Sequence, residues 1–215
     1  MTFPALIQKH QKNIAAKQLK IVYTKLYNAI EMAEAEHGEA RYWQYFNENL
    51  SRSDNSWIFT NTYLAPYFKK VNLYRDAKLH GCKNVTYRTL DGEVKECSSV
   101  WGFCGTCGSA YMGNMTQMHL IDGTIIIPLV RKTEITQQVE IDVDTNGYKG
   151  PNVWGKDVFR LFLSSYTDYK LLGAPSNNSR MSNLNTCKNN VYKNIYGCAA
   201  VIMADGWEIK DDYPW

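Results

Sequence analysis

The sequence has no apolar run of about 18 residues, the length that a helix needs to cross a bilayer. Met1 is not followed by a basic region and an apolar stretch, so the printed residues include nothing typical of a secretory signal. Taken alone, that pattern would indicate a cytosolic protein. The net charge is only +3 and no basic run has interleaved aromatics, so nucleic acid is not expected as a partner.

Sequence motifs of catalysis are also missing. There is no Gly-x-Ser-x-Gly, no Walker loop and no dinucleotide fingerprint. The four histidines, His10, His37, His80 and His119, stand apart and fit no metal-ligand or nucleophile pattern. Catalytic groups can be assembled in space, so missing motifs lower the expectation of an enzyme without removing it. We expect that the protein is not an enzyme.

What the sequence does contain suits a folded domain. Its 215 residues suffice for one sizeable core or two small ones. Aromatic residues reach 13%, with 15 Tyr and 6 Trp, which favours β-rich structure.

One long helix is expected over residues 5–37. Apolar residues recur there at spacings of three and four, which places them on one side of a helix: Leu19, Val22, Leu26, Ile30 and Ala33. Gly38 suits the end of this helix. We therefore divide the chain into an N-terminal helix, 1–38, and a globular α+β head, 39–215.

The charges on this helix have an unusual order. The first 25 residues hold no acid, and the charged residues run from Lys9, Lys12, Lys17, Lys20 and Lys25 to Glu31, Glu34 and Glu36. A free-standing helix prefers the opposite order, because its N-terminus carries partial positive charge. Either this is a solvated face, where each charge matters by roughly a few tenths of a kcal/mol, or the helix begins upstream.

After the helix we expect two short helices and then antiparallel strands, an α+β arrangement. The aromatic segments Tyr42–Leu50 and Asn61–Val71 are interpreted as the short helices. Hairpins are expected at three Asp-Gly pairs, the first as a type I′ turn: Asp91-Gly92, Asp122-Gly123 and Asp205-Gly206. Strands are also expected at 139–143, 158–163 and 199–203.

The six cysteines leave several chemistries open. Cys187 and Cys198 bracket a short polar loop, and we expect a disulfide between them. The other four are Cys82, Cys97, Cys104 and Cys107. They can form further disulfides in any of three pairings, a zinc site, or a redox pair at Cys104-Gly105-Thr106-Cys107. A second tight CxxC for zinc and a preceding buried strand for redox chemistry are both missing, so we favour disulfides.

A candidate calcium site follows from the run Asp142-Val143-Asp144-Thr145-Asn146-Gly147. Its oxygen ligands alternate and precede a glycine, as in the first half of an EF-hand loop. Val153 stands where that loop needs a bidentate Glu, although Asp157 offers a later carboxylate. Asp142, Asp144, Asn146 and Asp157 are therefore candidate calcium ligands, and the alternative is that they satisfy the backbone of a turn.

Three stretches together resemble type IV pilin-like proteins and type II secretion pseudopilins. The first runs from Phe3-Pro4-Ala5-Leu6-Ile7-Gln8-Lys9 to Glu34-Ala35-Glu36-His37-Gly38. The second is Ile141-Asp142-Val143-Asp144-Thr145-Asn146-Gly147-Tyr148-Lys149-Gly150-Pro151-Asn152 with Gly155-Lys156-Asp157-Val158-Phe159. The third joins Tyr196-Gly197-Cys198-Ala199-Ala200 to Asp205-Gly206-Trp207-Glu208-Ile209 and to Asp212-Tyr213-Pro214-Trp215. Residues 40–135 match this family poorly.

The resemblance implies a pilin-like fold, in which a long N-terminal α-helix packs on an antiparallel β-sheet. It implies a structural subunit of a type IV pilus or type II secretion pseudopilus, with homologous subunits as partners. An apolar helix upstream of Met1 would hold the subunit at the inner membrane before it joins a periplasmic or cell-surface filament. Phe3, Leu6 and Ile7 would then pack against neighbouring subunits.

Two other functions stay open. A pilin-anchored extracellular binding or adhesion module predicts that the aromatic residues of 41–80 line a pocket. A CxxC thiol oxidoreductase would use Cys104 and Cys107.

Overall fold

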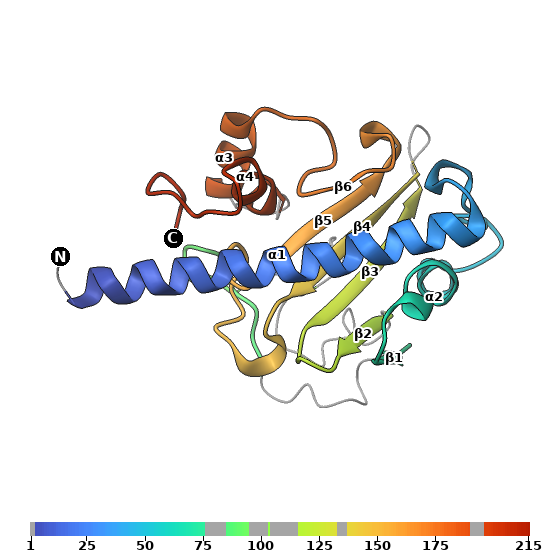
Figure 1. Ribbon diagram of the computed structural model, residues 1–215, viewed down its shortest axis with the longest axis horizontal. Coiled ribbons are helices and arrows are strands. Elements are labelled where there is room, and N and C mark those ends of the chain that lie inside the picture. Colours follow the sequence, from blue (N-terminus) through green and yellow to red (C-terminus); the bar gives the residue numbers. More distant parts are fainter. Residues whose placement is uncertain (1–2, 76–84, 95–102, 104–115, 133–136, 190–195) are drawn as a thin grey trace.

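The computed structural model describes residues 3–75, 85–94, 103, 116–132, 137–189 and 196–215. In these residues one long helix, α1 (Phe3–His37), lies across a six-stranded antiparallel sheet (Figure 1). A shorter helix, α2 (Arg52–Tyr63), packs beside the sheet, and α3 (Arg180–Lys188) and α4 (Cys198–Ala204) lie together at its other end. The expected α+β class is confirmed.

The sheet is a meander in which each strand is antiparallel to the next. Its strands neighbour one another in chain order: β1 (Val71–Tyr74), β2 (Gln117–Leu120), β3 (Ile125–Lys132), β4 (Gln137–Asp144), β5 (Val158–Ser164) and β6 (Leu171–Leu172). The strands expected at 139–143 and 158–163 are confirmed as parts of β4 and β5. The hairpin expected at Asp122-Gly123 joins β2 to β3, with the Gly123 N–H donating to the Leu120 carbonyl at 3.0 Å.

The turn at Asp91-Gly92 differs from its expected type. Arg88 and Val94 do form an antiparallel bridge. A type I′ turn needs positive φ at both central residues, but of this pair only Gly92 has positive φ, at 89°. The Thr89 N–H donates to the Glu93 carbonyl at 2.9 Å, so a three-residue loop closes the hairpin.

α1 packs on the sheet from Ala15 onward. All five residues of the predicted stripe are buried, and Ala15, Ala16 and Ala29 extend it. The stripe shares one apolar cluster with Ile141 and Leu161 of the sheet. Each large aliphatic side chain buried in this way contributes roughly 1.5–3 kcal/mol. The predicted long helix is confirmed, and Gly38, with φ at 80°, follows its last residue.

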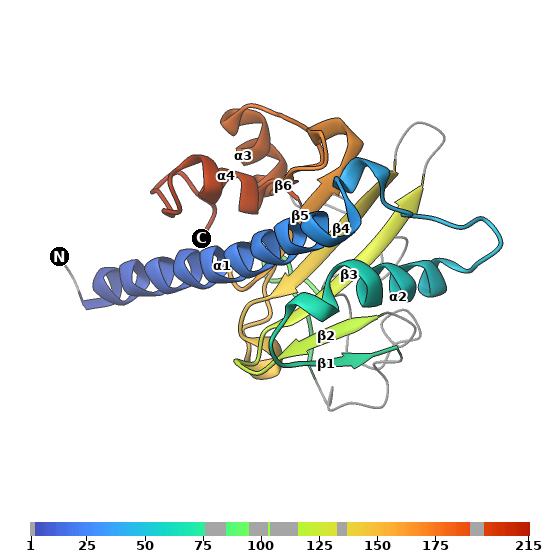
Figure 2. The ribbon, with the colours of Figure 1, turned by 45° about the vertical axis from the view of Figure 1, so that its right-hand side comes forward.

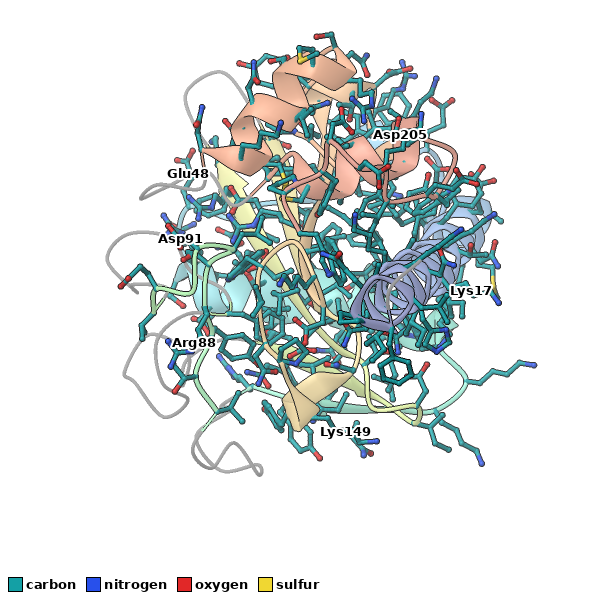
Figure 3. The ribbon with its side chains drawn as sticks, turned by 90° about the vertical axis from the view of Figure 1, so that its left-hand side faces the viewer. Lys17, Glu48, Arg88, Asp91, Lys149 and Asp205 are labelled. Carbon is teal, nitrogen blue, oxygen red and sulfur yellow. A yellow bond between two sulfur atoms is a disulfide. The ribbon has the colours of Figure 1, made fainter. Side chains whose placement is uncertain are left out.

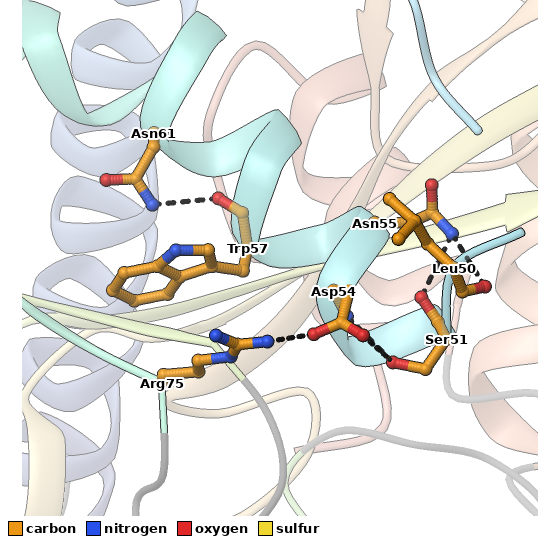
Figure 4. Close-up of polar contacts among 7 residues, drawn as sticks. All are labelled: Leu50, Ser51, Asp54, Asn55, Trp57, Asn61 and Arg75. Carbon is orange, nitrogen blue, oxygen red and sulfur yellow. Dashed lines mark hydrogen bonds and ion pairs between the residues drawn. The ribbon is translucent and has the colours of Figure 1, made fainter. Parts of the chain in front are cut away.

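The short helix expected at Tyr42–Leu50 is wrong, and the one expected at Asn61–Val71 is misplaced: α2 covers Arg52–Tyr63, and only a 3-10 turn, Ala65–Tyr67, follows it before β1. The Ser51 hydroxyl accepts the Asp54 N–H at 3.1 Å and donates to the Asp54 carboxylate at 2.7 Å (Figure 4). Asn55 donates to the Leu50 and Ser51 carbonyls at 3.2 and 2.9 Å. The start of this helix is therefore decided by capping side chains rather than by its aromatic residues.

The strand expected at 199–203 and the hairpin at Asp205-Gly206 are also wrong, because α4 occupies this segment. A short apolar run fits a buried strand or a buried helix equally well. The Trp207 N–H donates to the Ile202 carbonyl at 2.8 Å and the Gly206 N–H to the Met203 carbonyl at 3.1 Å. These bonds form a Schellman motif, so Gly206 ends a helix.

Candidate functional site

The first turns of α1 extend beyond the rest of the molecule (Figures 1 and 2). None of residues 3–14 is buried, and the first buried residue of the helix is Ala15. Phe3 is 79% exposed, Leu6 56% and Ile7 44%. Their exposure is what filament packing requires, and that role remains a prediction. No helix in the described ranges is both long and apolar enough to cross a membrane.

A groove of about 350 Å³ lies where this part of α1 meets the body. One wall is α1 at Ile14 and Ala15, and another is the loop from Asn146 to Asp157. The C-terminal Trp215 forms a third wall, and the Lys156 ammonium lies 5.3 Å from the centre of its indole ring.

Backbone contacts fix the shape of the loop at 144–157. The Asp157 carboxylate accepts the Asn152 N–H at 2.8 Å and the Val153 N–H at 2.6 Å. Gly147 has φ at 64°, and a Cβ there would lie 2.3 Å from the Gly123 carbonyl oxygen. Both observations explain why this loop needs an acid and a glycine at these places.

Two buried carboxylates stand close together in this loop. Burial raises the pKa of Asp144 well above its ordinary value, and the charge of Asp157 raises it further. Burial also raises the pKa of Asp157, against the lowering effect of its backbone hydrogen bonds. The Tyr87 hydroxyl donates to Asp144 at 3.1 Å. Burial and mutual repulsion therefore both favour the neutral, protonated form of Asp144 in the folded protein.

We predict that Asp144→Asn makes the protein more stable than the wild type as the pH rises. A carboxyl group whose pKa is higher in the folded than in the unfolded chain stabilises the folded state at pH values below its unfolded pKa. This stabilisation is lost as the pH rises through the folded pKa. The amide cannot ionise, so the variant escapes a loss of about 1.4 kcal/mol for each unit of pKa shift. Urea unfolding with EDTA at several pH values between 4 and 8 measures this. A difference that stays constant with pH would contradict it.

The structure brings together three of the four candidate calcium ligands. Asp144, Asn146 and Asp157 share the loop, and the Asn146 side-chain oxygen is buried without a hydrogen-bond partner among the described residues. Asp142 instead pairs with Arg160, whose Nε lies 2.5 Å from its Oδ1. Within the described part of the chain no group of three or more His, Cys, Asp or Glu is placed to hold a metal. Calcium binding stays a prediction.

If calcium binds here, millimolar calcium should raise the melting temperature by about 5–10 °C at one hundred times the dissociation constant. A bound cation would offset the repulsion between the carboxylates of Asp144 and Asp157, and this would stabilise the folded state. Differential scanning fluorimetry measures the shift, with magnesium as the control ion. Asp157→Asn should abolish it, and an unchanged melting temperature of the wild type would remove calcium from consideration.

A charged network lies on the face of the sheet opposite α1, and the sequence interpretation missed it. Arg160 is 3% exposed and contacts Asp142 and Glu140, and Arg131 contacts Glu140 from β3. The Arg160 guanidinium lies 5.7 Å from the ring centre of Trp154. The sequence did contain a signal for this network, because Arg160 is a single arginine inside the apolar run of β5.

The C-terminal segment is bonded to the loop at 144–157 and is also held together by bonds among its own residues. The predicted disulfide between Cys187 and Cys198 is confirmed, and it links α3 to α4. The Tyr213 hydroxyl donates to the Gly155 carbonyl at 2.6 Å. Arg180 pairs with Asp205 and Asp212, at 2.6 and 2.8 Å. Cys82, Cys97, Cys104 and Cys107 lie outside the described residues.

Most of the aromatic residues after α1 belong to the main core, although Tyr42 is 77% exposed. Trp43, Tyr45 and Phe59 are buried, and Tyr63 stacks on Trp43 with ring centres 4.4 Å apart. The adhesion alternative expected a pocket lined by such residues, but here these side chains pack against one another and against α1.

These observations define an α+β protein in which a partly projecting helix crosses an antiparallel meander. The chain belongs to the family described as "Family of unknown function (DUF6613)", whose model matches residues 5–215. No curated protein and no solved structure matched the chain.

Proposed function

We propose that this protein is a non-catalytic structural subunit of a type IV pilus or type II secretion pseudopilus-like filament. The observation that carries the proposal is the division of α1. Its second half packs on the sheet, whereas its first turns extend away with Phe3, Leu6 and Ile7 exposed. Apolar side chains exposed together on a protein surface are typical of a missing partner.

The position of the three resembling stretches supports the proposal. The loop at 144–157 and the C-terminal Trp215 are far apart in the sequence, yet both line the groove, together with α1 at Gln11–Gln18. The poorly matching residues include α2, β1 and β2, and none of these three elements lines the groove.

In this proposal an apolar helix upstream of Met1 anchors the subunit in the inner membrane before assembly. Homologous subunits then join it through head-to-tail contacts that do not close, which is how a repeated contact gives a filament. The Lys-rich turns of α1 would lie in the middle of a longer helix, where the macrodipole has little effect. The filament would stand in the periplasm or at the cell surface.

The reading frame upstream of the Met1 codon is the first test. We expect it to encode a basic leader, a processing site and about 20 apolar residues. The full gene product, expressed with its processing peptidase, should then appear in sheared filaments under the electron microscope. A stop codon or a polar segment directly upstream, or a processed product that never leaves the membrane, would overturn the proposal.

A further inference from the structure

The groove between α1, the loop at 144–157 and Trp215 collects polar side chains that have no partner among the described residues. Gln11 and Gln18 stand on its α1 wall, and neither side chain makes a hydrogen bond there. Lys156 stands on the loop wall and forms no ion pair, and its ammonium lies 5.3 Å from the centre of the Trp215 ring. Unpartnered polar groups that converge on one groove with apolar walls are typical of a small-ligand site.

The charges of the groove walls favour an anionic ligand. Lys156 is the one basic residue in the described lining. The one acid there, Asp157, uses both carboxylate oxygens to accept the backbone N–H groups of Asn152 and Val153, at 2.8 and 2.6 Å. The α1 wall adds no negative charge, because residues 1–25 hold no acid. A carboxylate of the ligand is therefore the complementary partner for Lys156.

The aromatic wall and the amides favour a sugar ring as the body of that ligand. The face of the Trp215 indole carries partial negative charge, which attracts the weakly positive C–H bonds of a pyranose ring. The amides of Gln11 and Gln18 can both donate and accept hydrogen bonds, as sugar hydroxyls do. The groove volume of about 350 Å³ is at the lower end of ordinary ligand pockets, roughly 300–1,000 Å³, so it suits a single ring.

A peptide C-terminus also carries a carboxylate, but the loop is not arranged to bind one. Proteins capture such a terminus with successive free backbone N–H groups. In this loop the N–H groups of Asn152 and Val153 already donate to Asp157. The Lys156 N–H donates to the Val153 carbonyl at 3.0 Å. Side chains are thus the groups that remain for a ligand, and this favours a ligand rich in hydroxyls.

Contacts within the chain hold the groove walls in place before a ligand binds. Tyr213 is buried, and its bond to the Gly155 carbonyl at 2.6 Å fixes the chain two residues before Trp215. Arg180 holds the same segment through Asp212, at 2.8 Å. A preformed site loses little conformational entropy on binding, which leaves more of the contact energy for affinity.

We propose that this groove binds a sugar that carries a carboxylate, as hexuronic acids do. Lys156 pairs with the carboxylate, Trp215 stacks on the ring, and Gln11 and Gln18 form hydrogen bonds with the hydroxyls. The inference goes beyond the proposed function and does not depend on it, because one copy of the chain holds the whole site. A filament would repeat the site along its length, and repeated weak sites bind a polymer of such sugars more tightly than one site does.

Titration with D-glucuronate and D-galacturonate, followed by saturation-transfer NMR in the presence of EDTA, tests the site. A hexuronate has about 13 non-hydrogen atoms, and ordinary ligand efficiency then predicts a Kd of about 1 mM. D-glucose and D-galactose, which lack the carboxylate, should bind about tenfold more weakly. The absence of saturable binding for both uronates would overturn the proposal. So would equally tight binding of acetate or of N-acetylalanine, a mimic of a peptide terminus.

Two substitutions separate the charge from the ring. Lys156→Gln should raise the Kd of the uronates about tenfold and leave that of the neutral sugars unchanged. The matched control is Lys149→Gln, since Lys149 is an exposed lysine of the same loop that Figure 3 shows at the edge of the molecule, apart from α1. Trp215→Ala should abolish binding of both kinds of sugar, and far-UV circular dichroism checks that each variant folds. Equal effects of Lys156→Gln and Lys149→Gln would overturn the site.

The outcome is independent of the test of the filament function. Binding is measured on single copies of the chain, so a groove that takes no uronate leaves the filament proposal standing. A stop codon or a polar segment upstream of Met1 would overturn the filament proposal, and uronate binding that depends on Lys156 would stand without it.

Discussion

Arg160→Met is expected to lower the free energy of unfolding by about 3–5 kcal/mol. The guanidinium is buried in β5, where its Nη2 lies 2.8 Å from Asp142 Oδ2 and its Nη1 lies 2.9 Å from Glu140 Oε2. Removing it leaves the fully buried Asp142 without its counter-charge and leaves Glu140 with Arg131 as its ion-pair partner. Guanidinium chloride unfolding followed by tryptophan fluorescence measures the loss.

Two variants separate charge from packing. Arg160→Met combined with Asp142→Leu removes the closest pair together, and it should recover a good part of the lost stability, because both buried charges are gone. Arg131→Met should cost less than Arg160→Met, since Arg131 is partly exposed and contacts Glu140 alone in the network, at 3.0 Å. A loss below about 1 kcal/mol for Arg160→Met would mean that water or rearrangement compensates the two acids.

The network of Arg160 with Asp142 and Glu140 explains why Asp142 was wrongly grouped with the candidate calcium ligands of the loop. β4 and β5 pair so that Asp142 stands directly opposite Arg160. Cross-strand neighbours of opposite charge interact strongly when buried. The register between two strands is set by the whole sheet and its turns, so a single strand's sequence does not reveal it. Asp144, two residues on, faces Tyr87 instead and stays with the loop.

The elements that were predicted correctly share a strong local signal. The stripe in α1 repeats over several turns, and β4 and β5 are long runs rich in branched residues. α2 was misplaced because its start is decided by the capping side chains Ser51 and Asn55, which the aromatic content of the segment does not reveal. α4 was misplaced because a short apolar run fits a buried strand and a buried helix equally well.

The exposed apolar side chains of α1 were predicted only at its free end. Phe3, Leu6 and Ile7 stood out because they begin the helix, but Ile14, Ile21 and Met32 were overlooked. α1 carries two apolar stripes, and the sequence does not say which of them meets the sheet. The burial of Leu19 and Val22 decides this, and the second stripe becomes visible as a surface only then.

Replacing Cys187 and Cys198 together by alanine is expected to lower the free energy of unfolding by about 2–4 kcal/mol. The bond closes a sequence separation of 11 residues and joins the end of α3 to the start of α4. Loss of this link enlarges the conformational freedom of the unfolded chain. The melting temperature should fall by about 4–16 °C. Met181→Ala, an exposed change on α3, is the control.

Substitution is the sharper tool here, since a reductant would also reach the chain's other four cysteines. An unchanged melting temperature would mean that packing alone holds α3 and α4 together. The same variant also tests the groove. The Cys198 sulfur lies 3.1 Å from where a Cβ at Gly155 would stand, and Tyr213 bonds the Gly155 carbonyl. Loosening this junction should displace Trp215 from the groove wall and shift the tryptophan fluorescence of the folded protein, whereas Met181→Ala should leave that fluorescence as it is.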